Sequence, residues 1–311
     1  MRILITGITG FAGRHLTDFI SGRPGAKVYG ISRGRQADKK IYACDLRDAK
    51  KISAIVKAVK PDRVFHLAAQ SSVQLSWKEP SDTFEQNLMG TLNLLEAVRQ
   101  FSPRAKVQIA GSAQEYGVPP KKTARLDERA PVNPQSPYAV SKVAQDLLAS
   151  QYGLQYGLQI VRTRAFNHIG PGQSPDFLAA SLARQIARIE AGKQNPVILA
   201  GNLDTVRDYT DVRDMARAYW LALEKGQPGE VYNIASGRGY SARQILNSYL
   251  ELSRVKITVK ADPARMRAND LSRLVGDARK FTRRTGWKPR IPVKTTLLDT
   301  LNYWRQKVRH E

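Results

Sequence analysis

Short apolar segments rich in β-branched residues alternate with amphipathic stretches along the first half of the chain. Such segments, bounded by glycine, proline or charged residues, are typical of buried strands. When helices separate the strands in this way, the pattern predicts an α/β fold with a Rossmann-type, doubly wound parallel sheet. The predicted strands are Ile3–Thr6, Lys27–Ile31, Ile41–Ala43, Arg63–Ala69, Val107–Ala110 and Leu158–Thr163.

Helical spacing of apolar residues is clearest in three stretches. One covers Leu178–Ala191, and another begins at Ser241, where Gln244 three residues later completes a capping box. The longest, Phe84–Phe101, predicts a helix that buries an apolar stripe. The stripe consists of Leu88, Leu92, Leu95 and Val98.

The pattern changes after residue 166, where longer loops containing proline and glycine replace the strict alternation. We therefore expect a Rossmann domain over residues 1–166 and a smaller, partly interleaved C-terminal substrate domain over residues 167–311. Segments near residues 205–240 are expected to return to the first domain, since Val231–Ala235 resembles another buried strand of the main sheet.

Three glycines follow the first strand directly and precede the first helix. Gly7, Gly10 and Gly13 in TGITGFAG allow a tight turn and let a pyrophosphate approach the backbone closely. The pyrophosphate can then accept hydrogen bonds from the N–H groups at the helix N-terminus. This context predicts dinucleotide binding, although glycines can also serve a purely structural turn. We include Phe11 and Leu46 among the candidate cofactor contacts.

Enzymes that prefer NAD place a carboxylate at the end of the second strand, where it binds the ribose 2′-hydroxyl. Here Ser32, Arg33 and Arg35 in GISRGR replace that acid. Guanidinium groups can bind a 2′-phosphate through paired hydrogen bonds, so the sequence predicts NADP(H). Asp45, after the third strand, is expected to accept from the adenine amino group.

Tyr138 and Lys142 in SPYAVSK lie four residues apart, which puts both side chains on one face of a helix. An ammonium beside a phenol lowers its pKa and equips it for acid–base chemistry. Such a pair can also be two helix-surface residues. Together with Ser112, placed just beyond the fifth strand, the pair predicts a catalytic set that transfers a proton to or from a carbonyl oxygen.

The segments TGITGFAG, HLAAQS, GSAQEYG and SPYAVSK resemble the extended short-chain dehydrogenase/reductases that modify nucleotide sugars. The resemblance covers nearly the whole chain. It implies that Lys142 also binds the nicotinamide ribose beside Tyr138, that Ala68 and Gln70 line the cofactor, and that Asn87 supports the site.

In the second half, FNHIGPGQ, VRDYTDVRD, DPARMRAND and GWKPRIP resemble the GDP-mannose branch of that family. The resemblance implies that Asn167, Arg207 and Arg267 contact the nucleotide diphosphate or the sugar, and that Asp270 binds the ribose hydroxyls. It implies a GDP-linked 4-keto-6-deoxy hexose as the substrate. The other candidate substrate contacts are Ser112, Gln114, Leu178 and Ser181.

Gln114 distinguishes two reactions within this branch. A 4,6-dehydratase needs an acid–base carboxylate where this chain has Gln114, and an amide has no proton to exchange near neutral pH. Glu115 is adjacent, but neighbours in an extended segment point to opposite faces. We therefore predict a ketoreductase, with a dehydratase and a nucleotide-sugar 4-epimerase as alternatives.

The formal charge of +23, from 50 basic and 27 acidic residues, introduces an alternative from another class. It could recruit a catalytically silent, NADP-sensing protein to nucleic acid. The basic residues are scattered rather than clustered, so we expect no obligate nucleic-acid partner. The only cysteine, Cys44, cannot form an internal disulfide, which favours a reducing cytoplasm.

Three further expectations concern membranes, metals and assembly. No apolar window approaches the length needed to span a bilayer. No metal motif is present, and His168 is expected to pack in a loop rather than bind metal. The helices near Phe84–Phe101 and Tyr138–Tyr152 are those that related enzymes pair, so we expect a homodimer.

Overall fold

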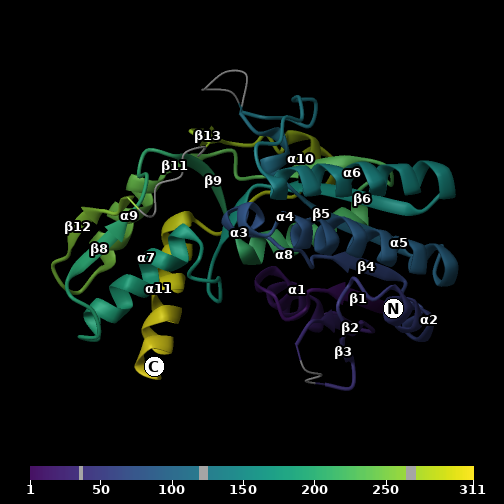
Figure 1. Cartoon of the computed structure of the whole chain (residues 1–311), viewed down its shortest axis with the longest axis horizontal. Coiled ribbons are helices and arrows are strands. Elements are labelled where there is room, and N and C mark those ends of the chain that lie inside the picture. Colours follow the sequence, from purple (N-terminus) through teal and green to yellow (C-terminus); the bar gives the residue numbers. More distant parts are fainter. Residues whose placement is uncertain (35–37, 119–124, 264–270) are drawn as a thin grey trace.

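The computed structural model describes residues 1–34, 38–118, 125–263 and 271–311. Among these residues, seven strands form one parallel sheet in the order β10-β6-β5-β4-β1-β2-β3. This arrangement confirms the predicted doubly wound fold (Figure 1). The strands are β1 (Arg2–Thr6), β2 (Lys27–Ser32), β3 (Ile41–Ala43), β4 (Arg63–His66), β5 (Lys106–Ser112), β6 (Gln159–Ala165) and β10 (Val231–Ile234).

Helices cover both faces of this sheet because its strands are apolar on both sides. In β1, Ile3 and Ile5 pack into one core and Leu4 into the other. One layer consists of α2 (Ala49–Val59), α5 (Gly90–Phe101) and α6 (Pro137–Tyr156). The other consists of α1 (Phe11–Ser21), α8 (Val212–Lys225) and α10 (Arg279–Thr285).

A smaller part lies beside the carboxyl ends of the central strands, at the left of Figure 1. Its core lies between three helices, α7 (Leu178–Glu190), α9 (Ala242–Leu252) and α11 (Val293–Arg309). A parallel pair joins β8 (Val197–Ala200) to β12 (Thr258–Ala261). A second sheet consists of β7 (Asn167–Ile169), β9 (Val206–Asp211), β11 (Gly239–Ser241) and β13 (Arg273–Leu274).

The two parts are interleaved, and the segments near residues 205–240 divide between them. α8 and β10 return to the large sheet, as expected for Val231–Ala235, whereas β9 and β11 remain in the second sheet. The capping box of Ser241 and Gln244 is confirmed at the start of α9. No helix in the described part of the chain is long and apolar enough to cross a bilayer.

The predicted helix over Phe84–Phe101 is helical throughout, but it is not a regular α-helix. Two short helices, α3 (Val73–Lys78) and α4 (Pro80–Phe84), lead into a π-helical turn over Glu85–Met89, and α5 follows. The wider turn shifts the phase of the helix, so Leu88 and Leu92 are only half-buried while Leu94 is fully buried. The predicted stripe is therefore confirmed in part: Leu95 and Val98 are buried as expected, and the half-buried Leu92 packs against the same core.

Candidate active site

A large cleft runs along the carboxyl ends of the central strands, which is where open α/β sheets bind ligands. Its volume is about 2340 Å³, and its walls come from both parts of the molecule. The glycine turn before α1 lies in one half of this main cleft, and α7 and β8 lie in the other. The predicted catalytic residues Ser112, Tyr138 and Lys142 line it together.

Ser112 and Tyr138 are placed by a strand end and a helix start. Ser112 is the last residue of β5, which extends two residues beyond the predicted strand. Tyr138 lies in the first turn of α6, where Ser136 caps the helix by accepting from the backbone N–H of Ala139. Burial raises the pKa of Tyr138 to about 12, and a hydrogen bond with the Ser112 side chain acts in the opposite direction.

Lys142 lies one turn further along α6, and its ammonium is held by neighbours other than Tyr138. It donates to the carbonyl oxygen of Ala110 at 2.5 Å and to the side-chain oxygen of Gln145. Burial lowers the pKa of Lys142. The expectation that Lys142 lowers the pKa of Tyr138 is therefore wrong for this structure, because the burial of the phenol dominates.

Gln145 connects Lys142 to a chain of buried polar groups beneath the site. Its amide nitrogen donates to Thr91 Oγ1 at 2.7 Å, and that oxygen lies 2.8 Å from His66 Nε2. His66 Nδ1 in turn lies 2.7 Å from Thr6 Oγ1, next to the glycine turn. Gln145 was not predicted from the sequence, although its position three residues after Lys142 on a helix is a signal that could have indicated it.

The glycine turn has the geometry of a pyrophosphate cradle. Gly7 has φ of +71°, and a Cβ atom there would lie 2.9 Å from the Ala68 backbone. A Cβ atom on Gly13 would lie 2.1 Å from the carbonyl oxygen of Gly7, so both positions require glycine. α1 has no side-chain cap and no acid in its first turn, which leaves its N-terminus suited to an anion. These residues fit a dinucleotide.

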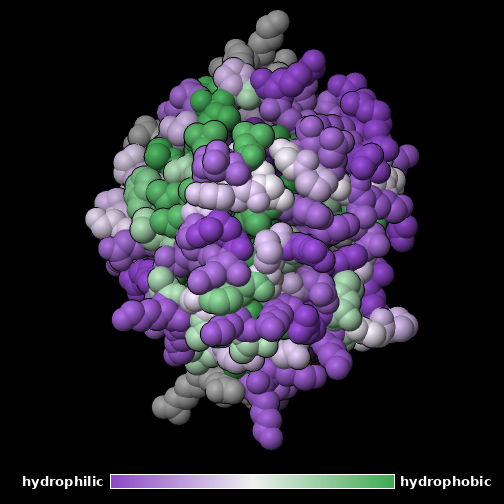
Figure 2. Space-filling view, turned by 90° about the vertical axis from the view of Figure 1, so that its right-hand side faces the viewer, coloured by the Kyte–Doolittle hydropathy of each residue, from purple (hydrophilic) through white to green (hydrophobic). Residues whose placement is uncertain are grey.

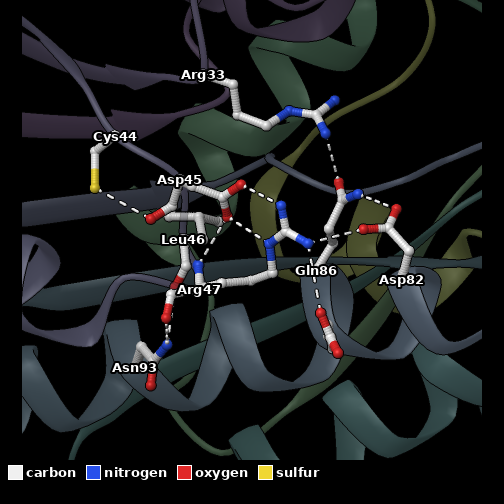
Figure 3. A network of polar contacts seen from close by, with 9 residues as sticks. Arg33, Cys44, Asp45, Leu46, Arg47, Asp82, Gln86 and Asn93 are labelled. Atoms are coloured by element: carbon white, nitrogen blue, oxygen red, sulfur yellow. Dashed lines mark hydrogen bonds and ion pairs between the residues drawn. The ribbon is translucent and has the colours of Figure 1, made fainter.

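Figure 3 shows the polar contacts at the end of the main cleft beside β2 and β3, where we expect the adenosine of the cofactor. Arg33 extends towards the π-helical turn, where its guanidinium donates to Gln86 Oε1 at 2.9 Å. The Gln86 amide nitrogen donates to Asp82, so the side chain that holds Arg33 is itself fixed by a hydrogen bond. Ser32 Oγ lies 2.7 Å from Thr9 Oγ1. Arg35 lies outside the described residues.

Asp45 lines the same end of the cleft but has a partner that the sequence analysis missed. Both of its carboxylate oxygens accept from Arg47, at 3.0 and 2.7 Å, and this guanidinium also reaches Asp82 and Glu85 (Figure 3). The hydrogen bond with Arg47 holds the pKa of Asp45 below its usual range. Leu46 is buried beside it and lines the cleft.

Two residues implied by the family resemblance support the site from below. Asn87, in the π-helical turn, accepts from the backbone N–H of Gln70 at 2.7 Å and donates to Ser141 Oγ at 2.9 Å. The Gln70 side chain is buried against Ser72 and Thr83. Neither Gln70 nor Asn87 is among the residues that line the cleft, whereas Ala68 is. Direct cofactor contact by Gln70 and Asn87 stays a prediction.

The predicted substrate residues within the described part of the chain gather in the other half of the cleft. Asn167, Leu178, Ser181 and Arg207 all line it. Arg267 and Asp270 lie outside the described residues. Sequence reasoning missed further lining residues, including two cations of α7 and several residues around β8: Arg184, Arg188, Asn195, Asn202 and Thr205.

Phe11 and His168 connect the two halves of the cleft. Phe11 begins α1, and its ring stacks on that of His168 in β7 with centroids 5.8 Å apart and planes 8° apart. Burial lowers the pKa of His168, so the ring is neutral near pH 7. This arrangement fits the packing role expected for His168.

The segment after Ser112 is a short helical turn, Ala113–Tyr116, rather than an extended strand. Gln114 lines the cleft, and Glu115 points into the protein. One oxygen of Glu115 accepts from the Ser112 backbone N–H at 2.7 Å, and the other accepts from Arg164 at 2.7 Å. Glu115 points away from Gln114, as expected. The cause is the helical turn and the ion pair with Arg164, and not the alternation of side chains along a strand.

The sequence and the fold were compared with those of known proteins. Residues 4–300 match the model of the GDP-mannose 4,6-dehydratase family. The chain belongs to this family. It is 35% identical to a GDP-6-deoxy-D-mannose reductase of Pseudomonas aeruginosa, over 100% of this chain and 99% of that protein. It is 34% identical to GDP-mannose 4,6 dehydratase 2 of Arabidopsis thaliana, over 93% of this chain and 82% of that one.

Two solved structures share the whole fold. RMD from Pseudomonas aeruginosa, complexed with NADPH, superposes with a TM-score of 0.89 at 32% identity, covering 98% of this chain and 99% of that one. A UDP-glucose 4-epimerase of Thermus thermophilus, in complex with NAD, has a TM-score of 0.88 at 33% identity with the same coverage. Membership of the GDP-mannose 4,6-dehydratase family confirms the prediction of an NAD(P)-dependent oxidoreductase that acts on nucleotide sugars.

Proposed function

We propose that this protein uses NADPH to reduce the C4 ketone of GDP-4-keto-6-deoxy-D-mannose, which yields GDP-D-rhamnose. The observation that carries the proposal is the pairing of an intact Ser112, Tyr138 and Lys142 set with Gln114 in the main cleft. Likeness to the reductase of Pseudomonas aeruginosa along its full length supports the same reaction.

NADP(H) supplies the hydride to the ketone carbon when it is bound in the cleft. Tyr138 donates its phenolic proton to the carbonyl oxygen, because its raised pKa keeps it protonated near neutral pH. Ser112 hydrogen-bonds the same oxygen as negative charge develops on it. The buried Lys142 is positioned by Ala110 and Gln145 to bind the nicotinamide ribose and to restore the proton.

A dehydratase would also need a carboxylate that removes the C5 proton and assists loss of the C6 hydroxyl. Gln114 is an amide and has no such proton. Glu115 is committed to the Ser112 backbone and to Arg164, and its side chain is 0% exposed. Proton removal by Glu115 would require breaking a buried ion pair, so reduction is the reaction that these residues support.

Stoichiometric consumption of the cofactor tests the proposal. We expect purified protein to oxidise one NADPH for each GDP-4-keto-6-deoxy-D-mannose reduced, with GDP-D-rhamnose as the product by NMR. The dTDP-linked keto sugar, supplied as a comparison, should react more slowly. Epimerisation with no net loss of NADPH would contradict the proposal.

We further propose a homodimer built through α6, with no obligate nucleic-acid partner and a cytoplasmic setting. α6 presents three apolar residues at seven-residue intervals, Val140, Leu147 and Leu154, which are 40%, 63% and 86% exposed. This spacing puts them on one side of the helix. The end of the molecule where α5 and α6 finish carries a group of hydrophobic residues within a mostly hydrophilic surface (Figure 2). Such a patch suits a second copy of the chain.

A further inference from the structure

A second cavity lies behind β9, away from the glycine turn and from Ser112, Tyr138 and Lys142. Its volume is about 480 Å³, within the range of small-molecule sites. β9, β11, β13 and α10 meet in this region, at the top of Figure 1. We infer that this second cavity binds an organic phosphate, a phosphate ester with an apolar or aromatic portion.

The charge of the lining is the first reason. Among the described residues, five cations line the second cavity against a single acid, Asp277. That acid is already paired with Arg279 at 2.6 Å. The other four cations have no side-chain ion pair within the described part of the chain, and they are Arg125, Arg238, Lys288 and Arg290. A concave site with four unpaired cations favours a ligand with more than one negative charge.

Two buried carboxylates hold the walls in place. Asp208 accepts from the backbone N–H groups of Ser236 and Gly237, both at 2.8 Å, and so fixes the loop that carries Arg238. Asp214 accepts from the backbone N–H groups of Arg290 and Ile291, at 2.6 and 2.8 Å. The cations therefore project from loops that are already ordered, which lowers the entropy lost on binding.

The floor of the cavity contains a polar group that has no partner. Thr210 is 1% exposed and lines the cavity, and its Oγ1 forms no hydrogen bond within the described part of the chain. Buried hydroxyls are usually satisfied, so an unpartnered one on a residue that lines a cavity fits a ligand with a polar group at this wall. α11 also begins at this cavity with Val293, without a side-chain cap or an acid in its first turn.

The apolar residues of the lining favour a ligand that carries an apolar group in addition to its phosphate. The rings and aliphatic side chains of the cavity wall can pack against a base or another ring. They belong to Tyr240, Ile291, Pro292 and Val293. β9 forms a wall that this cavity shares with the main cleft: Arg207 lines the cleft, Thr210 lines the cavity, and Tyr209 between them borders both.

Titration with adenosine 5′-monophosphate tests the inference. Full-length protein saturated with NADPH and GDP, which occupy the main cleft, should bind this nucleotide at one further saturable site by calorimetry. Inorganic pyrophosphate should compete with it. The R238A/R290A variant should bind on the order of tenfold more weakly or worse, since two charge-assisted contacts are lost. Both side chains are exposed and unpaired, so folding should be unaffected.

The matched control is K50A/R104A, which removes the same charge from exposed positions on the far layer of the molecule. It should leave the affinity within about twofold, because distant surface charges are screened. T210V should also weaken binding without lowering the thermal midpoint. No saturable binding, or equal weakening in R238A/R290A and K50A/R104A, would overturn the inference, as would a lack of competition by pyrophosphate.

Discussion

Arg33 follows β2 at the end of the cleft where we expect the adenosine, and Gln86, which is itself hydrogen-bonded to Asp82, holds its guanidinium (Figure 3). Because the Gln86 hydrogen bond already holds the guanidinium in place, the side chain loses little conformational freedom when it binds a phosphate. We therefore expect this exposed arginine to discriminate between cofactors that differ by one phosphate.

Replacing Arg33 with alanine should reduce kcat/KM for NADPH about tenfold, the lower range for a hydrogen bond to a charged group. NADH has no phosphate at this position, so its kcat/KM should change little and serves as the internal control. Initial rates with both cofactors measure the ratio. An equal loss for the two cofactors would show that Arg33 acts on the fold and not on the phosphate.

Tyr138→Phe should lower kcat by about 10²–10⁴ while leaving the affinity for NADPH unchanged, because only the proton donor is removed. Wild-type reduction should fall as the pH rises through the lowered pKa of Lys142, about 8, because Lys142 restores the proton to Tyr138, whose own pKa is raised to about 12. Below that pH the phenol carries the proton that it donates. Turnover close to wild type in the variant would remove Tyr138 from the mechanism.

At the scale of elements, the end of β5 and the short turn after it are held by β6 and α6. Arg164 of β6 donates to Glu115 at 2.7 Å and to Asp146 of α6 at 2.9 Å, and all three side chains are buried. Gly111 is required beside them, since a Cβ atom there would lie 2.6 Å from Glu115 Oε1. This cluster fixes Ser112 relative to Tyr138.

Arg164→Met should reduce the free energy of unfolding by about 3–5 kcal/mol, because the buried Glu115 would lose its ion-pair partner, whereas Asp146 would keep Arg162 at 3.3 Å. Urea unfolding followed by circular dichroism measures the change. Arg129→Met is the matched control: Arg129 also pairs with an aspartate, Asp127, but on the surface, and its loss should alter the unfolding midpoint little. Equal effects of the two substitutions would contradict the assigned role of the cluster.

Regular periodicity allowed the strands, the glycine turn and the Tyr138–Lys142 pair to be predicted from sequence. Local departures from regularity could not be predicted in the same way. The π-helical turn at Asn87 depends on hydrogen bonds to Gln70 and Ser141, which are distant in sequence. The pairing of Glu115 with Arg164 likewise joins residues that are distant in sequence, so no spacing rule encodes it.

At the scale of the whole molecule, the apolar face of α6 predicts the oligomeric state. Sedimentation velocity at micromolar concentration should show a homodimer, and L147K/L154K should shift it towards monomer, because two exposed leucines become charged in the interface. Leu298→Lys on α11 changes a leucine that is 38% exposed on another helix and should leave the dimer intact. A wild-type monomer under these conditions would refute the proposed assembly.

The protein is proposed to reduce a GDP-linked 4-keto-6-deoxy sugar in the main cleft and not to form that sugar by dehydration of GDP-mannose. The most direct test of this proposal is a comparison of two reactions of one enzyme preparation: GDP-mannose with NADP⁺, and GDP-4-keto-6-deoxy-D-mannose with NADPH. With Gln114 in the cleft and Glu115 bound to Arg164, we predict rapid reduction and no dehydration above background. Conversion of GDP-mannose to the 4-keto-6-deoxy sugar at a rate comparable with reduction would contradict the account.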